Sequence, residues 1–324
     1  MRTPLVTVVI PTHNRFEMLE EALESLMRQT LSDWEAVVVD DGSSPAVAFD
    51  RLTARFGGRV RGLRHEVPRG GPAAKNSGVR SARGQFLAYL DDDDLYHPAY
   101  LASAVRALAA EPSVDVVFMD VSAFGSKAVQ SEAAYARAMA KTLEYAQGTE
   151  VQPGLIGFDE RLVYALLRSV PMAFQRPVVR RSAIDEIGLY REHCFLWDCD
   201  WAIRAALAVR TALLTDPLYL QRAGDQGYST SGSRLHDAVL SQCEIKQTLF
   251  ARSESEPELR KWRDAFREAT ARSLLDLAYF YRQQSELRHA WQAWMRSQQY
   301  HVSIRRFSFL VRLAATALSR RRYA

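Results

Sequence analysis

The chain has 324 residues, of which 48% are hydrophobic and 25% charged, the balance of a globular protein with a sizeable core. It contains no run of eighteen apolar residues, so we expect no membrane-spanning helix. Three cysteines are too few for a disulfide framework, and their spacing does not resemble a zinc site. These features predict a cytoplasmic protein.

The net charge of +4 is unevenly distributed along the chain. Six arginines and no acidic residue lie between positions 302 and 324. The rest of the chain has 36 basic and 38 acidic residues and is close to neutral. A nucleic-acid-binding protein needs basic residues spread over a folded face, so this distribution argues against a nucleic-acid partner.

Short β-branched runs alternate with amphipathic segments over the first 120 residues. We predict strands at residues 6–10, 36–39, 60–63, 86–90 and 114–119. We predict helices at residues 16–29, 51–56, 73–82 and 100–110. This alternation is typical of an α/β fold, with a mostly parallel sheet and helices on both of its faces.

The pattern becomes mainly helical further along the chain. Residues 131–169 are predicted to be helical although their pattern is weak, and the signal after residue 235 is almost wholly helical. Residues 274–295 have the pattern of a helical hairpin. We therefore predict an α/β domain at 1–232, with halves at 1–120 and 121–232, and a helical C-terminal extension at 233–324.

Polar residues gather where the predicted strands end. Residues 11–15 follow the first strand, Asp40 and Asp41 follow the second, and four aspartates at 91–94 follow the fourth. Ligands of open α/β sheets bind at the carboxyl ends of the strands. The sequence therefore predicts a ligand site at this edge.

The four consecutive aspartates allow two interpretations. Short acidic runs are usually solvated loops, and this one could cap a helix that begins near Pro98. Alternatively, hard carboxylate oxygens suit Mg²⁺ or Mn²⁺, and the place at a strand end favours a metal. The chain has neither a P-loop nor a G-x-G-x-x-G motif, so a diphosphate held mainly by metal is the remaining simple hypothesis.

Several segments, in this order, resemble the motifs of family 2 glycosyltransferases of the GT-A fold. They are VTVVIPTHNR at 6–15, VVDDGS at 38–43, AKNSG at 74–78, LDDDDL at 90–95, VVRRS at 178–182, IGLY at 187–190 and WDCDW at 197–201. The resemblance covers roughly residues 5–228. It implies a Rossmann-like, mixed and mostly parallel sheet, and transfer of a sugar from a nucleotide donor with inversion at the anomeric carbon.

The resemblance implies roles for residues of the first half, the nucleotide-binding half. Asp41 matches an aspartate that hydrogen-bonds uracil, although turn capping is the simpler role for one of Asp40 and Asp41. Lys75 matches a basic position near the phosphates. In the second half, residues 226–229 match a loop that closes over the diphosphate. The segment that lines the nucleotide comprises Pro11, Thr12, His13, Asn14 and Arg15.

The aspartate run matches the family's metal motif. By this match Asp93 is the main ligand of Mn²⁺ or Mg²⁺, Asp91 assists it, and Asp91 and Asp92 contact ribose or water of the metal shell. Asp94 is expected to cap the following helix. The metal is expected to neutralise the leaving diphosphate.

The second half, 121–232, is expected to bind the acceptor. Asp198 falls where the family places the base that deprotonates the acceptor hydroxyl, with Asp200 as the alternative. The simpler role for Asp198 is to cap the helix that follows it. Trp197 stands directly before Asp198, where the family usually has an acidic residue. Its side chain could stack on the acceptor sugar or pack in the core.

The arginine-rich end of the chain also has two interpretations. Apolar residues form one stripe of a helix, namely Ile304, Phe307, Val311, Ala314, Ala315 and Leu318. Together with the arginines beside it, this stripe suits a helix on an anionic membrane surface. The alternative is a terminal helix that packs on the preceding helices.

We therefore expect an inverting, metal-dependent glycosyltransferase that uses a nucleotide sugar, with UDP favoured. A glycan or lipid-linked acceptor is expected, with a role in cell-surface polysaccharide synthesis and contact with the inner face of the plasma membrane. The alternatives are a sugar nucleotidyltransferase and a non-catalytic adaptor of similar fold.

Overall fold

The computed structural model describes residues 3–224, 234–302 and 304–321. The chain divides into two compact units. The first comprises Met1–His193 and Trp197–Gln226, and the second comprises Cys194–Leu196 and Gly227–Ala324. The loop predicted at 226–229 lies outside the described residues.

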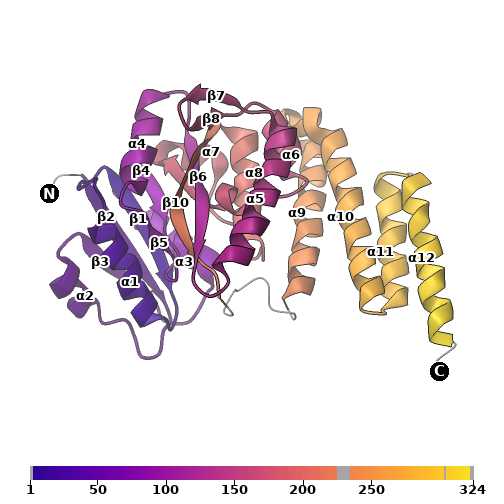
Figure 1. Ribbon diagram of the computed structural model, residues 1–324, viewed down its shortest axis with the longest axis horizontal. Helices are drawn as coiled ribbons and strands as arrows, with labels where there is room; N and C mark the ends of the chain where they lie inside the picture. The colour runs from indigo at the N-terminus through magenta and orange to yellow at the C-terminus, as the bar shows by residue number, and fades with distance from the viewer. Residues whose placement is uncertain (1–2, 225–233, 303, 322–324) are drawn as a thin grey trace. The chain divides into compact units, whose positions relative to one another are not determined.

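The first unit is built on one mixed sheet, which has ten strands in the described part of the chain (Figure 1). The strands are β1 Val6–Thr12, β2 Trp34–Asp41, β3 Val60–His65, β4 Phe86–Tyr89, β5 Leu95–Tyr96, β6 Val116–Phe124, β7 Thr149–Gln152, β8 Leu155–Gly157, β9 Pro177–Arg180 and β10 Thr211–Arg222. Their order is β3-β2-β1-β4-β9-β6-β10-β8-β7, and β5 pairs with β10.

Strand direction decides which chain ends meet at the site. Strands β3, β2, β1 and β4 are parallel, so their carboxyl ends share one edge. Strand β9 runs antiparallel to both of its neighbours, β4 and β6. The residue before β9 therefore lies beside the residues that follow β4.

Helices connect and cover these strands. The α-helices of this unit are α1 Phe16–Met27, α2 Phe49–Phe56, α3 Gly71–Ser81, α4 Tyr100–Ala110, α5 Ala128–Ala146, α6 Arg161–Leu166, α7 Ile184–Ile187 and α8 Trp197–Ala208. Short 3₁₀ turns lie at Met172–Gln175 and Arg181–Ala183. Helix α3 packs on β1 and β2, while α4 and α5 pack on β6.

The predicted α/β fold with a mixed sheet and C-terminal helices is confirmed. The expectation of helix throughout 131–169 is wrong in part, because β7 and β8 form a hairpin that turns at Gly154 with φ +75°. Strand β10 carried no prediction. Its apolar run is interrupted around Pro217, where its register with β6 shifts, so the local pattern does not indicate a strand. Pairing with β6 and β8 nevertheless stabilises the strand.

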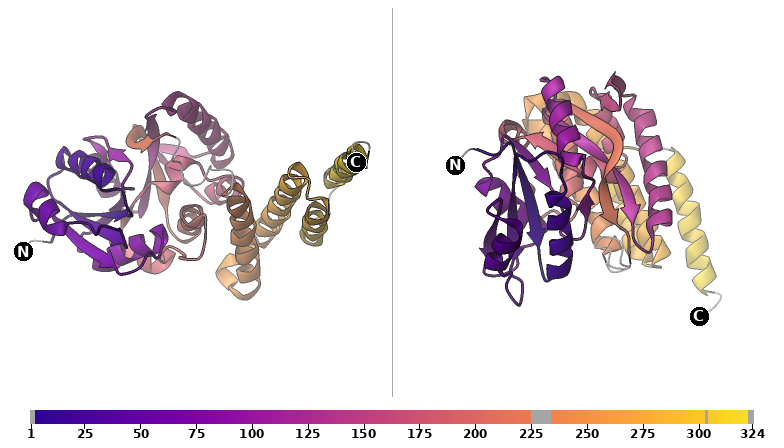
Figure 2. Two further views of the ribbon diagram at one scale, coloured as in Figure 1. Left: turned by 90° about the horizontal axis from the view of Figure 1, so that it is seen from below. Right: turned by 60° about the vertical axis from the view of Figure 1, so that its left-hand side comes forward.

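The second unit is a set of packed helices. They are α9 Leu235–Ser255, a 3₁₀ turn Pro257–Trp262, α10 Arg263–Gln283, α11 Leu287–Tyr300 and α12 Ile304–Arg321. Figure 2 shows α10 beside α9 and α11, as their contacts also require. The predicted hairpin is thus present as α10 and α11. No helix among the described residues has the length and apolar character needed to cross a membrane.

One buried acidic residue links neighbouring strands at the amino ends of β1 and β2. Glu35 of β2 is 3% exposed and accepts hydrogen bonds from Thr7 Oγ1 at 2.8 Å, Arg61 Nε at 3.1 Å and Arg83 Nε at 2.9 Å. Burial opposes its ionisation, but these donors lower the pKa of Glu35 from 4.5 to about 2. The charged carboxylate therefore stabilises the folded state.

We predict that Glu35→Gln lowers the free energy of unfolding by about 1–3 kcal/mol at pH 7, since charge-assisted hydrogen bonds are lost. The folded-state pKa is depressed, so the effect is fully present above the unfolded pKa and shrinks as pH falls from about 4.5 to about 2. Urea unfolding across this pH range measures it.

Glu24→Gln is the matched control. The Glu24 side chain is 43% exposed and pairs with the exposed Arg55, so its loss should change the free energy of unfolding by less than about 0.5 kcal/mol. Equal effects of the two substitutions would contradict the stabilising role of Glu35.

Candidate functional site

The turns that follow β1 and β2 are joined by hydrogen bonds. His13 Nδ1 donates to the backbone carbonyl of Asp41 at 2.8 Å. The N–H of Asn14 donates to Ser43 Oγ at 3.0 Å, and Asn14 Oδ1 accepts from the N–H of Ser44 at 2.8 Å. The segment predicted to line the nucleotide thus lies against the turn that contains Asp41.

The two aspartates at the end of β2 have different partners. Asp40 is fully buried and accepts from the backbone N–H of Ser43 at 2.8 Å and of Val47 at 3.0 Å, which makes it the turn-capping residue. Asp41 accepts from the N–H groups of Arg69 and Gly70 at 2.9 and 2.7 Å. Asp41 therefore shapes the loop that leads into α3.

Lys75 is not the solvated lysine that its helical position would suggest. It is 3% exposed on α3, and its Nζ lies 2.6 Å from Asp91 Oδ1. The ammonium also lies 4.5 Å from the centre of the Trp197 ring. Helix α3 thereby brings a buried positive charge to the end of β4.

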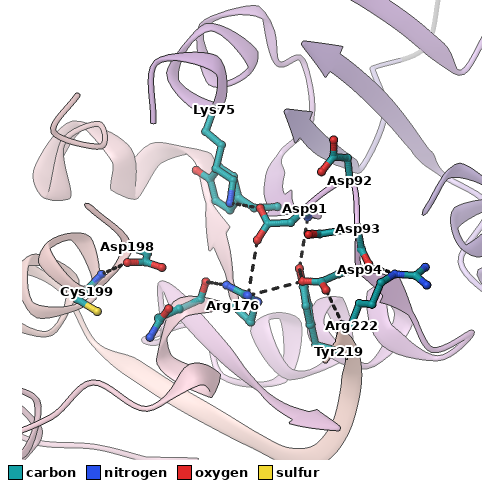
Figure 3. Close-up of polar contacts among 12 residues, drawn as sticks. Lys75, Asp91, Asp92, Asp93, Asp94, Arg176, Asp198, Cys199, Tyr219 and Arg222 are labelled. Carbon is teal, nitrogen blue, oxygen red and sulfur yellow. Dashed lines mark hydrogen bonds and ion pairs between the residues drawn. The ribbon is translucent and has the colours of Figure 1, made fainter. Parts of the chain in front are cut away.

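The side chains of Asp91, Asp92 and Asp93 diverge, as Figure 3 shows. Asp91 Oδ1 lies beside Lys75, and its Oδ2 lies 3.6 Å from Arg176 Nη2. Burial opposes its ionisation, but these two cations hold the pKa of Asp91 below its ordinary value. This carboxylate is therefore charged at neutral pH.

Arg15 reaches the next two aspartates from the turn after β1. Its Nη1 lies 3.2 Å from Asp92 Oδ1 and 2.8 Å from Asp93 Oδ2. Burial raises the pKa of Asp92 to about 6, and burial together with Asp91 raises the pKa of Asp93. This pair carries more negative charge than its surroundings neutralise.

The expectation that Asp94 caps a helix is wrong. Helix α4 begins at Tyr100 without a side-chain cap, whereas Asp94 accepts from Tyr219 Oη and from the N–H of Arg222, both at 2.8 Å. Arg222 Nε also donates to the carbonyl of Asp93 at 2.8 Å. Strand β10 therefore anchors the aspartate turn through Asp94.

Asp198 is half-buried in the first turn of α8, and its Oδ1 accepts from the N–H of Cys199 at 2.8 Å. Burial raises its pKa, and Arg176 and Lys75 oppose this rise. The structure thus brings Asp198 into the same electrostatic environment as Asp91 (Figure 3). A carboxylate with a raised pKa is a stronger proton acceptor than a solvated one.

Asp200, the alternative base, is fully buried. It lies 3.0 Å from Arg191 Nη1 and 2.8 Å from Arg204 Nε. With both oxygens engaged and no exposed surface, Asp200 serves as an anchor for its two arginines. Trp197 packs edge-on against Tyr190 as well as over Lys75, and its side chain is only half-buried.

The carboxylates of the aspartate run offer oxygen ligands for a divalent cation. Among the described residues, no three His, Cys, Asp or Glu side chains converge on one point. However, Asp92 Oδ2 is buried and has no hydrogen-bond partner in the described part of the chain, and Asp92 and Asp93 have raised pKa values. Mg²⁺ commonly uses one or two carboxylates and takes its other ligands from phosphates and water. The residues therefore fit a cation that is shared with a diphosphate.

Sequence reasoning did not identify the partners of the aspartate run that come from distant strands. These are Arg176, Tyr219 and Arg222. Arg176 directly precedes β9, whose antiparallel register with β4 sets its position. The local sequence pattern around Arg176 does not indicate how β9 pairs with β4.

The chain resembles proteins of known sequence or structure. It is 33% identical over 92 residues to Escherichia coli WfgD, a UDP-Glc:alpha-D-GlcNAc-diphosphoundecaprenol beta-1,3-glucosyltransferase, a match that covers 28% of this chain and 36% of WfgD. The matched stretches span 15–38% of the length of the curated relatives.

Two solved structures share the fold. S. aureus TarS 1–349, in complex with UDP-GlcNAc, has a TM-score of 0.57 and 18% identity over 91% of this chain and 92% of that one. The mannosyltransferase PcManGT of Pyrobaculum calidifontis, in complex with GDP-Man and Mn²⁺, has a TM-score of 0.52 and 19% identity over 98% and 81%. At these identities the likeness concerns the fold alone.

The family model agrees with the fold and with the motifs at the strand ends. Glycosyl transferase family 2 matches residues 7–162, which include β1, β2, α3 and the aspartate run after β4. Residues 7–162 therefore belong to glycosyltransferase family 2, and the sheet has the GT-A fold.

Proposed function

We propose that this chain transfers a sugar from a nucleoside diphosphate sugar, with UDP favoured, to an acceptor hydroxyl, with inversion at the anomeric carbon. The observation that carries the proposal is that Asp91 and Asp198 share the electrostatic environment of two buried cations, Lys75 and Arg176, while Asp93 lies beside Arg15 in the same aspartate run (Figure 3). This arrangement offers charge for a diphosphate and a proton acceptor for a hydroxyl.

The nucleotide would lie along the carboxyl ends of β1 and β2. Residues 11–15 and Asp41 would contact the base and ribose at this edge. Lys75 would supply positive charge near the phosphates, and Asp91 and Asp92 would contact the ribose or water bound to the metal. Asp93 would hold Mn²⁺ or Mg²⁺, with Asp91 assisting. When bound, the cation stabilises the negative charge of the leaving diphosphate.

Asp198 would act as the general base. Its carboxylate accepts the proton of the acceptor hydroxyl, and the hydroxyl oxygen forms a bond to the anomeric carbon. The bond from that carbon to the diphosphate oxygen breaks, and its electron pair leaves with the nucleoside diphosphate. Attack opposite the leaving group inverts the configuration. The raised pKa of Asp198 suits this step, because the base must hold the proton as it transfers.

We infer that the acceptor is a glycan or a lipid-linked sugar and that the reaction serves cell-surface polysaccharide synthesis in the cytoplasm. The name of WfgD, whose acceptor is linked to diphosphoundecaprenol, supports this choice. The 121–232 half would bind the acceptor, and the helices of the second unit would form the predicted C-terminal extension.

Helix α12 supports contact with an anionic membrane surface. Phe309 is buried in the core of the helical unit, with Leu310 and Leu313 packed against that core. Phe307 and Val311, in contrast, are 44% and 73% exposed. The side chains of Ile304, Ala315, Leu318 and all the helix arginines except Arg312 lie outside the described part. One face of α12 thus packs on the unit while another remains available to lipid.

A panel of nucleotide sugars tests the proposed activity. We expect release of nucleoside diphosphate from one donor by the wild type, and Asp198→Asn should lower turnover by about 10²–10⁴-fold with unchanged donor binding. Asp216→Asn, at an exposed position of β10, is the matched control and should behave as the wild type. Near-normal turnover of Asp198→Asn would place the base elsewhere.

The metal assignment is tested by thermal unfolding with UDP, with and without Mn²⁺. A ligand at 100 times its Kd stabilises the folded state by about 2.7 kcal/mol, so bound nucleotide should raise the Tm of the wild type when Mn²⁺ is present. Asp93→Asn should lose the Mn²⁺-dependent part of this rise, whereas Asp216→Asn should keep it. A Mn²⁺ response retained by Asp93→Asn would refute the role of Asp93.

Vesicle co-sedimentation tests the membrane contact. The double substitution Phe307→Ser/Val311→Ser should weaken binding to phosphatidylglycerol vesicles roughly tenfold, since two side chains lose apolar contact with lipid. Val129→Ser removes an apolar side chain of α5 that is 81% exposed, more than either of these two, and should have no effect. Failure of the wild type to bind anionic vesicles, or equal binding by all variants, would rule the contact out.

A further inference from the structure

Two helices carry the residues proposed for phosphate binding and for proton transfer. Helix α3 carries Lys75, whose Nζ lies 2.6 Å from Asp91 Oδ1, and α8 carries Asp198 in its first turn. Figure 3 shows these residues on separate helices. The helices contact each other through Lys75 and Trp197, whose ring centre lies 4.5 Å from the ammonium. A second connection runs through residues 188–192, which precede α8.

Asn76 attaches this segment to α3. It is 1% exposed, and its amide binds both backbone groups of Tyr190. The N–H of Tyr190 donates to Asn76 Oδ1 at 2.9 Å, and Asn76 Nδ2 donates to the carbonyl of Tyr190 at 2.9 Å. Because a backbone N–H only donates and a carbonyl only accepts, this pair fixes which end of the amide carries the nitrogen. The same Nδ2 also donates to Glu192 Oε1 at 3.1 Å.

Helix α8 holds the segment from its other side. Trp201 Nε1 donates to the carbonyl of Gly188 at 3.0 Å, and Arg204 Nη2 donates to the carbonyl of Leu189 at 2.9 Å. Both donors belong to buried side chains of α8. The backbone of the segment is therefore hydrogen-bonded to α3 at one residue and to α8 at two others.

The ring of Tyr190 lies against the first turns of α8. It is 5% exposed, and its centre lies 4.8 Å from that of Trp197, edge-on, and 5.6 Å from that of Trp201. Asp198 directly follows Trp197 in the chain. A displacement of Tyr190 therefore reaches the turn that presents the Asp198 carboxylate.

We propose that Asn76 is a positioning residue that fixes Asp198 relative to Lys75, because its amide binds the backbone of Tyr190 and thereby holds the start of α8. The inference rests on the proposed function for its effect on turnover, but the environment of Trp197 can be measured without turnover. It links the donor side of the site to the acceptor side through one buried amide.

The near-isosteric substitution Asn76→Asp tests this role. It keeps an oxygen for the N–H of Tyr190 but turns a second oxygen toward the carbonyl of Tyr190 and the carboxylate of Glu192, which only accept. We expect kcat to fall by about 10²-fold, the loss expected when a reacting group moves by about 1 Å. The KM of the donor and the Kd of UDP with Mn²⁺ should stay as in the wild type, because Lys75 keeps its contact with Asp91.

Gln85→Glu is the matched control, because it also replaces an amide by a carboxylate, at an exposed position. It should behave as the wild type. Wild-type kcat in Asn76→Asp would overturn the inference. Parallel losses of donor binding and turnover would indicate general structural damage and would overturn it as well.

Fluorine NMR of protein labelled with fluorotryptophan reports on Trp197 directly, with its signal assigned by Trp197→Phe. Asn76→Asp should shift or broaden this signal and leave that of Trp34, on β2, unchanged. An unchanged Trp197 signal would overturn the inference even if the enzyme transfers sugar. A changed Trp197 signal in a protein that transfers no sugar would support the inference and refute the proposed function.

If Asn76→Asp does not fold, the wild type alone provides the test. The N–H of Tyr190 should exchange with deuterium at least about 10³-fold more slowly than in an unfolded chain, because a buried, hydrogen-bonded amide is exposed only when part of the fold opens. Faster exchange than this would mean that Asn76 does not hold the segment, which would overturn the inference.

Discussion

The site depends on the neutralisation of a carboxylate cluster by buried cations. Four aspartates follow a buried central strand, and a fifth, Asp198, lies in the same field. Without positive charge at that place, mutual repulsion and desolvation would protonate most of them. Lys75 and Arg176 prevent this for Asp91, while Asp92 and Asp93 retain raised pKa values beside Arg15. The arrangement is thus electrostatically divided into a neutralised side and an acidic side.

Some aspartates at the strand ends hold the backbone of their turns and do not face the site. Asp94 is withdrawn from the site by Tyr219 and Arg222, and it holds the turn in which Asp93 stands. Asp40 likewise holds its own turn through the backbone of Ser43 and Val47. Asp41 also holds backbone, because it accepts from the N–H groups of Arg69 and Gly70 in the loop that leads into α3.

Features that depend on the local sequence pattern could be predicted from the sequence. Alternating runs predicted the sheet and its helices, and the rule that ligands bind at the carboxyl ends of strands predicted the edge along which both Asp41 and Asp91 lie. Features that depend on distant pairing were not predictable in this way. Arg176 reaches Asp91 only because β9 is antiparallel to β4, and Asp94 was misassigned because its partners lie on β10, more than a hundred residues away.

The central claim is that a nucleoside diphosphate binds on the acidic side of this cluster through a shared cation. The most direct measurement is a crystal structure with UDP and Mn²⁺, using the anomalous signal of manganese. We expect an anomalous peak for a manganese ion that contacts both Asp93 and the diphosphate. Arg15, which contacts Asp93 in the present structure, should then have moved away from it. Nucleotide bound away from the ends of β1, β2 and β4, or manganese without contact to Asp91, Asp92 or Asp93, would contradict the account.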